Sequence, residues 1–201
     1  QFSLDIRVGP HMVKGIELNS FAQELAQVTV WIGHLQWHLK NGFFFEKDPV
    51  LKPIETIECR DAILDFTDTK RSKEAVWPEA DVVIGNPPFL GGKKMRTVLG
   101  DDYVEGMFTV YDERVPHEAD LVTYWFEKAR AAIEAGRLKR AGLLATNSIR
   151  GGASRRVLDR IRESGRIFVA WSDEPWVVEG ASVRISIVGF DRGEEQQILL
   201  N

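Results

Sequence analysis

Two consecutive prolines directly after a run of β-branched residues set a hard limit on how this chain folds. Asp81 to Ile84 is a short run with three β-branched residues, Val82, Val83 and Ile84, which favours a buried central strand. Pro87 and Pro88 then fix φ and remove two N–H donors, so the backbone can neither continue a β-ladder nor enter a helix interior. The strand must therefore end in a stiff corner, with Asn86 before it and Phe89 after it.

This corner places two chemically useful groups beside each other. The carboxamide of Asn86 offers both a hydrogen-bond donor and an acceptor. The ring of Phe89 offers a flat face on which a planar base can stack. The segment therefore predicts a site for a flat heterocycle that carries an amino group. The alternative is an ordinary proline turn at a strand end, because Asn-Pro commonly opens turns.

Composition narrows the class of protein. The 201 residues are 44% hydrophobic, which suits one globular domain with a substantial core. The net charge of −4 argues against a domain that grips a phosphate backbone with its whole surface, so basic contacts must be confined to a local patch. Cys59 is the only cysteine, which excludes a disulfide framework and a cysteine-based metal cage. His34 and His38 have helical spacing, but we expect no metal site.

Other patterns predict a cytoplasmic protein without a membrane segment. There is no apolar run of about 18 residues and no secretory signal layout at the N-terminus.

Strands and helices alternate along most of the chain. This order predicts an α/β fold, with a mostly parallel sheet and helices on both faces. The last two strands are joined by an irregular segment, Ser172–Ser182, which favours an antiparallel C-terminal hairpin. Residues 65–79 read as a loop, and 91–119 as short helices in a long excursion. The predicted strands are Met12–Leu18, Ile54–Cys59, Asp81–Gly85, Arg140–Thr146, Ile167–Trp171 and Val183–Phe190.

Three helices are predicted, and two of them carry recognisable start signals. Ser20 with Gln23 forms a capping box for a helix that ends near Asn41-Gly42. Asp120 is predicted to cap a second helix, Leu121–Ala135, and a short third helix runs over Ser154–Glu163. In the first helix the apolar residues recur at spacings of three and four and so share one face. These residues are Phe21, Leu25, Val28, Ile32, Leu35 and Leu39.

We call residues 86–89 the proline corner. The sequence around it resembles that of a known family. Asn-Pro-Pro-Phe after an apolar strand is similar to the catalytic motif of S-adenosylmethionine-dependent amino-methyltransferases. The segments Val82–Lys94, Tyr124–Arg130 and Gly142–Asn147 are closer still to the MmeI-like fused restriction-modification enzymes. The resemblance implies a Rossmann-like class I methyltransferase sheet. It also implies methyl transfer to adenine N6 in double-stranded DNA, with the adenine flipped out of the stack.

The resemblance also implies roles for individual residues. Asn86 and the Pro87 carbonyl would accept the N–H groups of the target amine, while Pro88 stiffens the turn and Phe89 stacks on the base. Glu17, at the end of the first strand, would accept the ribose hydroxyls of the cofactor, and Leu18 and Asn86 would also contact the cofactor. Asp61 and Ala62, after the second, would contact its adenine. Without the resemblance, Glu17 is an exposed acid before a helix, and Asp61 a turn or cap residue.

Basic and aromatic residues near other strand ends are further candidates. Lys93, Lys94 and Arg96 follow the proline corner, and Arg150 and Arg155 follow the strand that ends at Thr146. Both groups are candidates for DNA phosphate contacts, and solvated basic clusters are the alternative. The resemblance also puts Asp120 and Leu121 near the cofactor or target base. For Trp171 and Trp176, packing in the core is preferred over lining a base pocket.

One expected element is missing. The family pattern begins with a strand and a glycine-rich turn, but only Gly9 and Gly15 precede Glu17, without the required spacing. We therefore expect residues 1–190 to be a partial catalytic domain, with 191–201 as a tail or the start of another region. Nuclease and target-recognition parts would lie elsewhere in the parent enzyme. Loss of the first strand should leave an unpaired edge beside Val82–Ile84.

Two other functions remain open at this point. One is a protein glutamine N-methyltransferase, because an amide nitrogen poses the same chemical problem to the same turn. The other is an inactive or truncated fragment that acts as a DNA-binding or assembly module.

Overall fold

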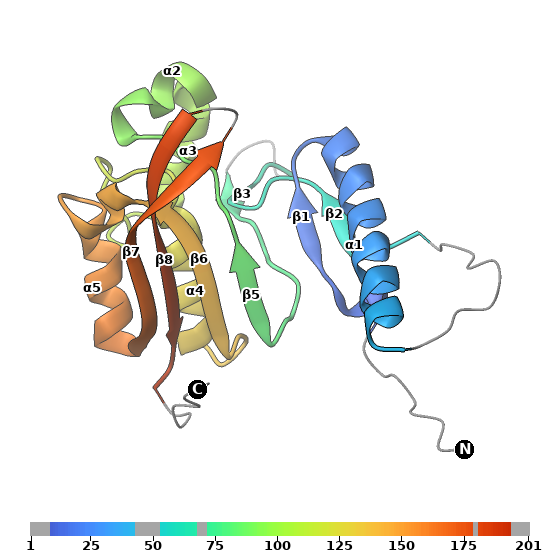
Figure 1. Cartoon of the computed structure of the whole chain (residues 1–201). Helices are drawn as coiled ribbons and strands as arrows, with labels where there is room; N and C mark the ends of the chain where they lie inside the picture. Colours follow the sequence, from blue (N-terminus) through green and yellow to red (C-terminus); the bar gives the residue numbers. More distant parts are fainter. Residues whose placement is uncertain (1–8, 43–52, 68–71, 179–180, 194–201) are drawn as a thin grey trace. The chain divides into compact units, whose positions relative to one another are not determined.

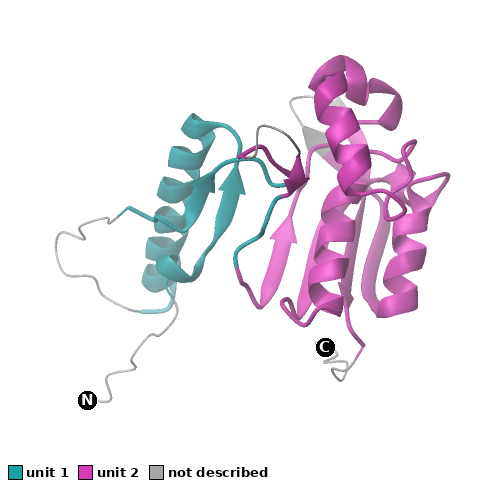
Figure 2. Ribbon diagram, turned by 180° about the vertical axis from the view of Figure 1, so that it is seen from behind, with its two compact units in different colours: residues 1–62, 75–78 teal, residues 63–74, 79–201 magenta. Residues whose placement is uncertain are grey.

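The structure is a computed structural model that describes residues 9–42, 53–67, 72–178 and 181–193. The chain forms two compact units (Figure 2). Unit 1 comprises residues 1–62 and 75–78, and unit 2 comprises residues 63–74 and 79–201. None of the helices among the described residues combines the length and the apolar character that a membrane crossing needs.

Unit 1 is a β-α-β unit in which a long helix connects two parallel strands (Figure 1). The strands pair from Gly15 opposite Ile57 to Glu17 opposite Cys59. Because they are parallel, their carboxyl ends lie at the same edge. The elements are η1 (Pro10–Met12), β1 (Gly15–Glu17), α1 (Ser20–Lys40) and β2 (Ile57–Cys59).

Helix α1 spans the predicted residues, but it starts differently. Its N-cap is Asn19, whose side chain accepts the N–H of Ala22 at 3.1 Å. The predicted capping box of Ser20 with Gln23 is therefore wrong. Gln23 donates instead to the carbonyl of Ile57 at 2.6 Å and so ties α1 to β2.

Five of the six residues in the apolar stripe predicted on α1 are exposed, and Leu35 is half-buried. Phe21 and Leu39 are 73% and 69% exposed, and no residue of α1 is buried. The periodicity therefore does not identify a buried face of α1.

Unit 2 contains a four-stranded sheet in the order β5-β6-β8-β7. β5 and β6 are parallel, and β8 runs antiparallel to both of its neighbours, which confirms the predicted antiparallel hairpin. Helices α4 and α5 lie against one face of this sheet (Figures 1 and 2), so within unit 2 the prediction of helices on both faces is not met. The main elements are β5 (Val82–Gly85), α4 (Thr123–Glu134), β6 (Arg140–Thr146), η3 (Asn147–Arg150), α5 (Arg155–Ser164), β7 (Arg166–Val178) and β8 (Ala181–Asp191).

Strand β5 is an edge strand, not a buried central one. It pairs with β6 alone among the described strands, and the side chain of Ile84 is 83% exposed. The prediction of a buried centre is thus wrong, whereas the predicted unpaired edge beside Val82–Ile84 is confirmed. Alternation survives in β6, where Ala141, Leu143 and Ala145 are buried.

Two predicted loops contain β-structure. The first is residues 65–79: β3 (Leu64–Asp65), which ends in this range, and β4 (Lys73–Glu74) form an antiparallel pair. The described residues of the predicted loop Ser172–Ser182 extend β7 and β8, which pair beyond the end of β6. The excursion after β5 holds short helices as predicted: η2 (Gly92–Lys94), α2 (Met95–Leu99) and α3 (Asp101–Val110).

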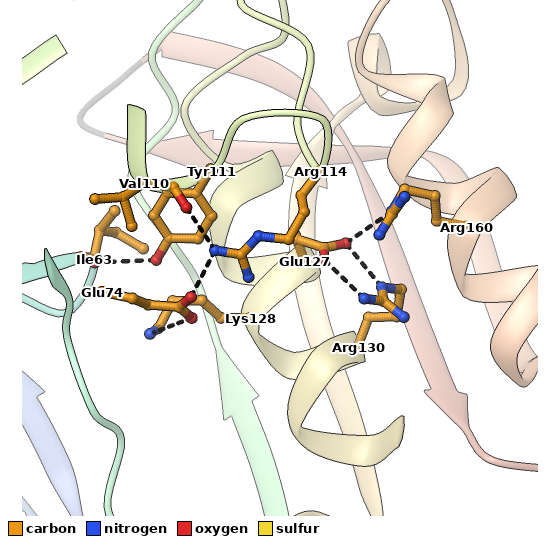
Figure 3. Close-up of polar contacts among 9 residues, drawn as sticks. All are labelled: Ile63, Glu74, Val110, Tyr111, Arg114, Glu127, Lys128, Arg130 and Arg160. Atoms are coloured by element: carbon orange, nitrogen blue, oxygen red, sulfur yellow. Dashed lines mark hydrogen bonds and ion pairs between the residues drawn. The ribbon is translucent and has the colours of Figure 1, made fainter. Parts of the chain in front are cut away.

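Buried charges stabilise unit 2 around α4 (Figure 3). Lys128 and Arg114 both contact Glu74 of β4, at 3.1 and 2.6 Å. Arg130 and Arg160 both contact the carboxylate of Glu127, the residue before Lys128 in α4. These ion pairs connect β4 and α5 to the same helix.

Candidate active site

The proline corner lies at the carboxyl end of β5, as predicted. Its entry is held by the ladder, in which Gly85 pairs with Leu143 of β6. Its exit is held by the backbone of Leu121, whose N–H donates to the carbonyl of Leu90 at 2.9 Å. The corner is therefore fixed at both ends by backbone hydrogen bonds.

Within the proline corner, the carboxamide of Asn86 is exposed to solvent. Pro87 is buried, Phe89 is half-buried, and Asn86 and Pro88 are exposed. The carboxamide of Asn86 forms no hydrogen bond with any residue that the structure describes. An exposed amide on a rigid turn can offer its oxygen and its NH₂ group to a ligand without first breaking a protein contact.

The basic residues after the corner differ in availability. Lys93 and Lys94 of η2 are exposed. Arg96 of α2 instead contacts Asp101 at 3.0 Å and Glu105 at 2.6 Å. Hydrogen bonds to these carboxylates raise the pKa of Arg96 above its ordinary value, and its charge is already balanced.

The second basic group follows β6, and the basic residues after β5 and β6 are called the basic rim: Lys93, Lys94, Arg96, Arg150 and Arg155. Arg150 of η3 and Arg155 at the start of α5 are both exposed, and Arg155 lies 3.6 Å from Asp159. Asp120 accepts hydrogen bonds from Gly92 of η2 and from Ser148 of η3. This bridge brings the loops that carry the two basic groups together at the carboxyl end of the β5–β6 pair, where open α/β sheets bind ligands.

The residues predicted to hold a cofactor gather at one edge of unit 1. Glu17 ends β1, Leu18 beside it is 71% exposed, and Asp61 follows β2 by two residues. The N–H of Arg60 donates to the carbonyl of Glu17 at 3.0 Å, which joins the two strand ends. Ala62 accepts a hydrogen bond from the indole of Trp77 at 2.8 Å.

Glu17 has one oxygen engaged locally. Its Oε1 accepts the N–H of Asn19 at 2.9 Å, next to the start of α1. A carboxylate has about four acceptor positions in total, so this bond leaves capacity for further donors.

Residues 2–201 match the family model described as the MmeI DNA-methyltransferase domain. The chain belongs to this family. It is 28% identical over 187 residues to DNA methyltransferase A of Bacillus subtilis (strain 168). The aligned region covers 88% of this chain and 20% of the Bacillus protein. Its fold matches that of the type IIL restriction-modification enzyme MmeI, solved in complex with DNA, with a TM-score of 0.69 at 23% identity. That match covers 94% of this chain and 26% of the solved one.

Two expectations for this MmeI-like methyltransferase domain need correction. Trp171 and Trp176 are 53% and 40% exposed, so the preferred core packing is wrong. Asp120 is not the cap of α4, because its side chain points to Gly92 and Ser148 and no side chain caps that helix.

A polar network at the end of β6 was missed by sequence reasoning. Asn147 contacts Asp173 and accepts the hydroxyl of Ser186 at 2.8 Å. Asp173 has a positive φ of 68° at a bulge in β7, and Arg184 of β8 grips its carboxylate. The Arg184 guanidinium holds the pKa of Asp173 below its ordinary value. Asn147 follows a strand directly, as Asn86 does, and that position was the available signal.

Two other places carry no part of this rim. His34 and His38 have ring centroids 4.2 Å apart, and the described residues contain no group of three metal-ligating side chains. A cavity of about 470 Å³ lies between residues 112–117 and α5, lined by Arg114, His117 and Arg160 among others. The proline corner contributes nothing to its lining.

Proposed function

We propose that this chain is the catalytic part of an S-adenosylmethionine-dependent methyltransferase that acts on the N6 amino group of adenine in DNA. The observation that carries the proposal is the free, exposed carboxamide of Asn86 on a rigid turn at the carboxyl end of β5. Family membership supports methyl transfer to DNA as the general activity.

The residues of unit 1 fit the adenosine half of the cofactor. Glu17 keeps free acceptor positions for ribose hydroxyls, and Leu18 offers an exposed apolar surface beside it. Asp61 and Ala62 would hold the adenine. The glycine-rich turn that would hold the methionine half has no counterpart in residues 1–201. We therefore propose that the chain alone binds the cofactor weakly, and micromolar affinity in calorimetry would contradict this.

The corner prepares the target nitrogen. The side-chain oxygen of Asn86 and the carbonyl of Pro87 would accept the two N–H bonds of the amine, which directs the nitrogen lone pair toward the methyl group that the cofactor would supply. Phe89 stacks on the base, which must leave the duplex to reach the corner. S-adenosylmethionine supplies the electrophilic methyl group when it is bound. Alignment and preorganised acceptors contribute most of the rate, and no general base with a shifted pKa is needed.

The basic rim is proposed to hold the DNA. Lys93, Lys94, Arg150 and Arg155 are exposed at loops that Asp120 joins, which suits contacts to phosphates on either side of a flipped base. Arg96 would have to exchange two carboxylate partners for a phosphate, so its contribution should be smaller. The nuclease and target-recognition parts of the parent enzyme would supply the remaining contacts to DNA.

The test uses the parent enzyme and labelled S-adenosylmethionine. Asn86→Ala is expected to lower kcat about 100-fold or more with the affinity for the cofactor changed less than about twofold. Asn41→Ala, at an exposed asparagine of unit 1, is the matched control and should keep wild-type activity. Full activity of Asn86→Ala would contradict the role of the carboxamide.

Substrate class is tested in the same assay. A duplex with unmodified adenine should accept label, and the same duplex with every adenine already N6-methylated should not. Label on cytosine would contradict adenine specificity. Label on a glutamine peptide in place of DNA would assign the chain to protein substrates, and no label on any substrate by the parent enzyme would identify an inactive module.

A further inference from the structure

Every polar group of Asp120 is engaged, although the residue lies in a connecting segment and not in a regular element. Its carboxylate divides between two loops: Oδ1 accepts the N–H of Gly92 at 3.0 Å, and Oδ2 accepts the hydroxyl of Ser148. Its own N–H donates to the hydroxyl of Ser154 at 3.1 Å, and its carbonyl accepts the hydroxyl of Thr123 at 2.6 Å. One residue thus joins three segments of unit 2 to the start of α4.

The first of these segments is the exit of the proline corner. Leu121 donates to the carbonyl of Leu90 at 2.9 Å, and Asp120 accepts from Gly92 two residues later. A Cβ added to Gly92 would lie 2.6 Å from the carbonyl oxygen of Glu118, so the two backbones are in direct contact. The position of the corner therefore depends on that of residues 118–121.

The second segment follows β6. Ser148 donates to Asp120, and its hydroxyl also lies 2.6 Å from that of Thr146, the last residue of the strand. Asp120 therefore relates the exit of the corner to the end of the neighbouring strand. Since Gly85 already pairs with Leu143 at the entry, Asn86 and Phe89 are held between two fixed points.

We propose that Asp120 is a positioning residue for methyl transfer: through Gly92 and Ser148 it fixes the orientation of Asn86 and Phe89 without touching the substrate. This inference rests on the proposed function. It differs from a direct contact with the cofactor or base, because it assigns the effect of Asp120 to the hydrogen bonds that each carboxylate oxygen already accepts from Gly92 or Ser148.

Two substitutions separate the roles of Asp120 in the parent enzyme. Asp120→Ala removes both acceptors and should lower kcat about 10- to 100-fold, because small misplacements of reacting groups are costly. The KM values for cofactor and DNA should change less than about threefold. Asp120→Asn keeps an oxygen for Gly92 and an NH₂ group that can donate to Ser148, so it should restore most of kcat. Asp102→Ala, at an exposed aspartate of α3, is the control for loss of charge.

Hydrogen exchange gives a readout that does not depend on the reaction. Asp120→Ala should increase amide exchange in a peptide covering residues 86–92, and Asp102→Ala should not. Faster exchange together with a lower kcat supports positioning. A raised KM for the cofactor with unchanged exchange would overturn it in favour of direct contact, and unchanged kcat and exchange would overturn it altogether. If the wild-type enzyme fails to methylate DNA, the exchange result still decides whether Asp120 fixes the corner.

Discussion

Arg130 grips Glu127 with two hydrogen bonds of 2.8 Å, and the carboxylate that it grips is fully buried within α4. Arg160 of α5 adds a third contact at 3.3 Å to the same carboxylate (Figure 3). The pair lies one turn apart on a helix that covers the sheet. Because the pair is buried, water cannot solvate either charge if its partner is removed.

Glu127→Ala should therefore destabilise unit 2 strongly. It leaves the guanidinium of Arg130, whose side chain is only 8% exposed, without its main buried partner. We expect the free energy of unfolding to fall by about 3–5 kcal/mol, measured by urea denaturation of the full chain. Glu134→Ala removes an exposed partner of the same arginine and should cost less than about 1 kcal/mol. Equal losses in the two variants would show that burial does not set the effect.

Stability should also respond to acid through Glu74. Burial acts to raise the pKa of Glu74, but Lys128 and Arg114 outweigh it and hold the pKa below its ordinary value of 4.5. Burial also lowers the pKa of Lys128, which Glu74 offsets only in part. A carboxyl with a depressed folded pKa stabilises the fold above its unfolded pKa. That contribution is lost as the pH falls below 4.5 through the folded pKa.

Glu74→Gln tests this linkage. At pH 7 the variant should be less stable than the wild type by about 1 kcal/mol, and the difference should shrink as the pH falls below about 4. Urea midpoints at a series of pH values provide the measurement. Glu105→Gln, at an exposed partner of Arg96, should show little difference at any pH. A gap for Glu74→Gln that stays constant with pH would contradict the predicted role.

Gly165 should be intolerant of any side chain. A Cβ there would lie 2.2 Å from the carbonyl oxygen of Asp191 in β8, where the chain turns from α5 into β7. Gly165→Ala should lower the free energy of unfolding by about 1–3 kcal/mol through forced backbone shifts. Gly151→Ala places its methyl group in open space and should stay within about 0.5 kcal/mol of the wild type. Similar thermal midpoints for the two variants would contradict this close contact.

Local patterns predicted the elements well because they depend on neighbouring residues. The helix from Ser20 and the strand from Arg140 to Thr146 follow from periodicity and flanking residues, and both have the predicted bounds. The pairing of β7 with β8 from Ser172 opposite Ser186 to Val178 opposite Ala181 was missed. In the sequence, Asp173, Glu174 and Pro175 are typical of a turn. In the structure they belong to β7, where a bulge places Asp173 against Arg184, 11 residues away in sequence.

For the candidate site, the sequence predicted where residues lie along the chain but not which side chains they contact. Strand ends followed by Asn86 or Asp61 mark carboxyl edges, and the structure places both residues there. Side-chain partners were not predictable. Asp120 looked like a helix cap because a helix follows it, yet its carboxylate contacts Gly92 and Ser148, each 28 residues away in sequence. Hydrogen bonds between residues this distant in sequence depend on the tertiary fold and have no signal in the local sequence.

The open edge of β5 should make the chain, when produced alone, associate with itself. An unpaired strand edge presents free backbone groups, and the exposed side chain of Ile84 adds apolar surface beside them. Ile84→Lys places a charge on this edge and should weaken concentration-dependent association about tenfold in sedimentation experiments. Val98→Lys makes a comparable change at a 62% exposed position of α2 and should leave association unchanged. An equal effect of both variants would locate the association outside the strand edge.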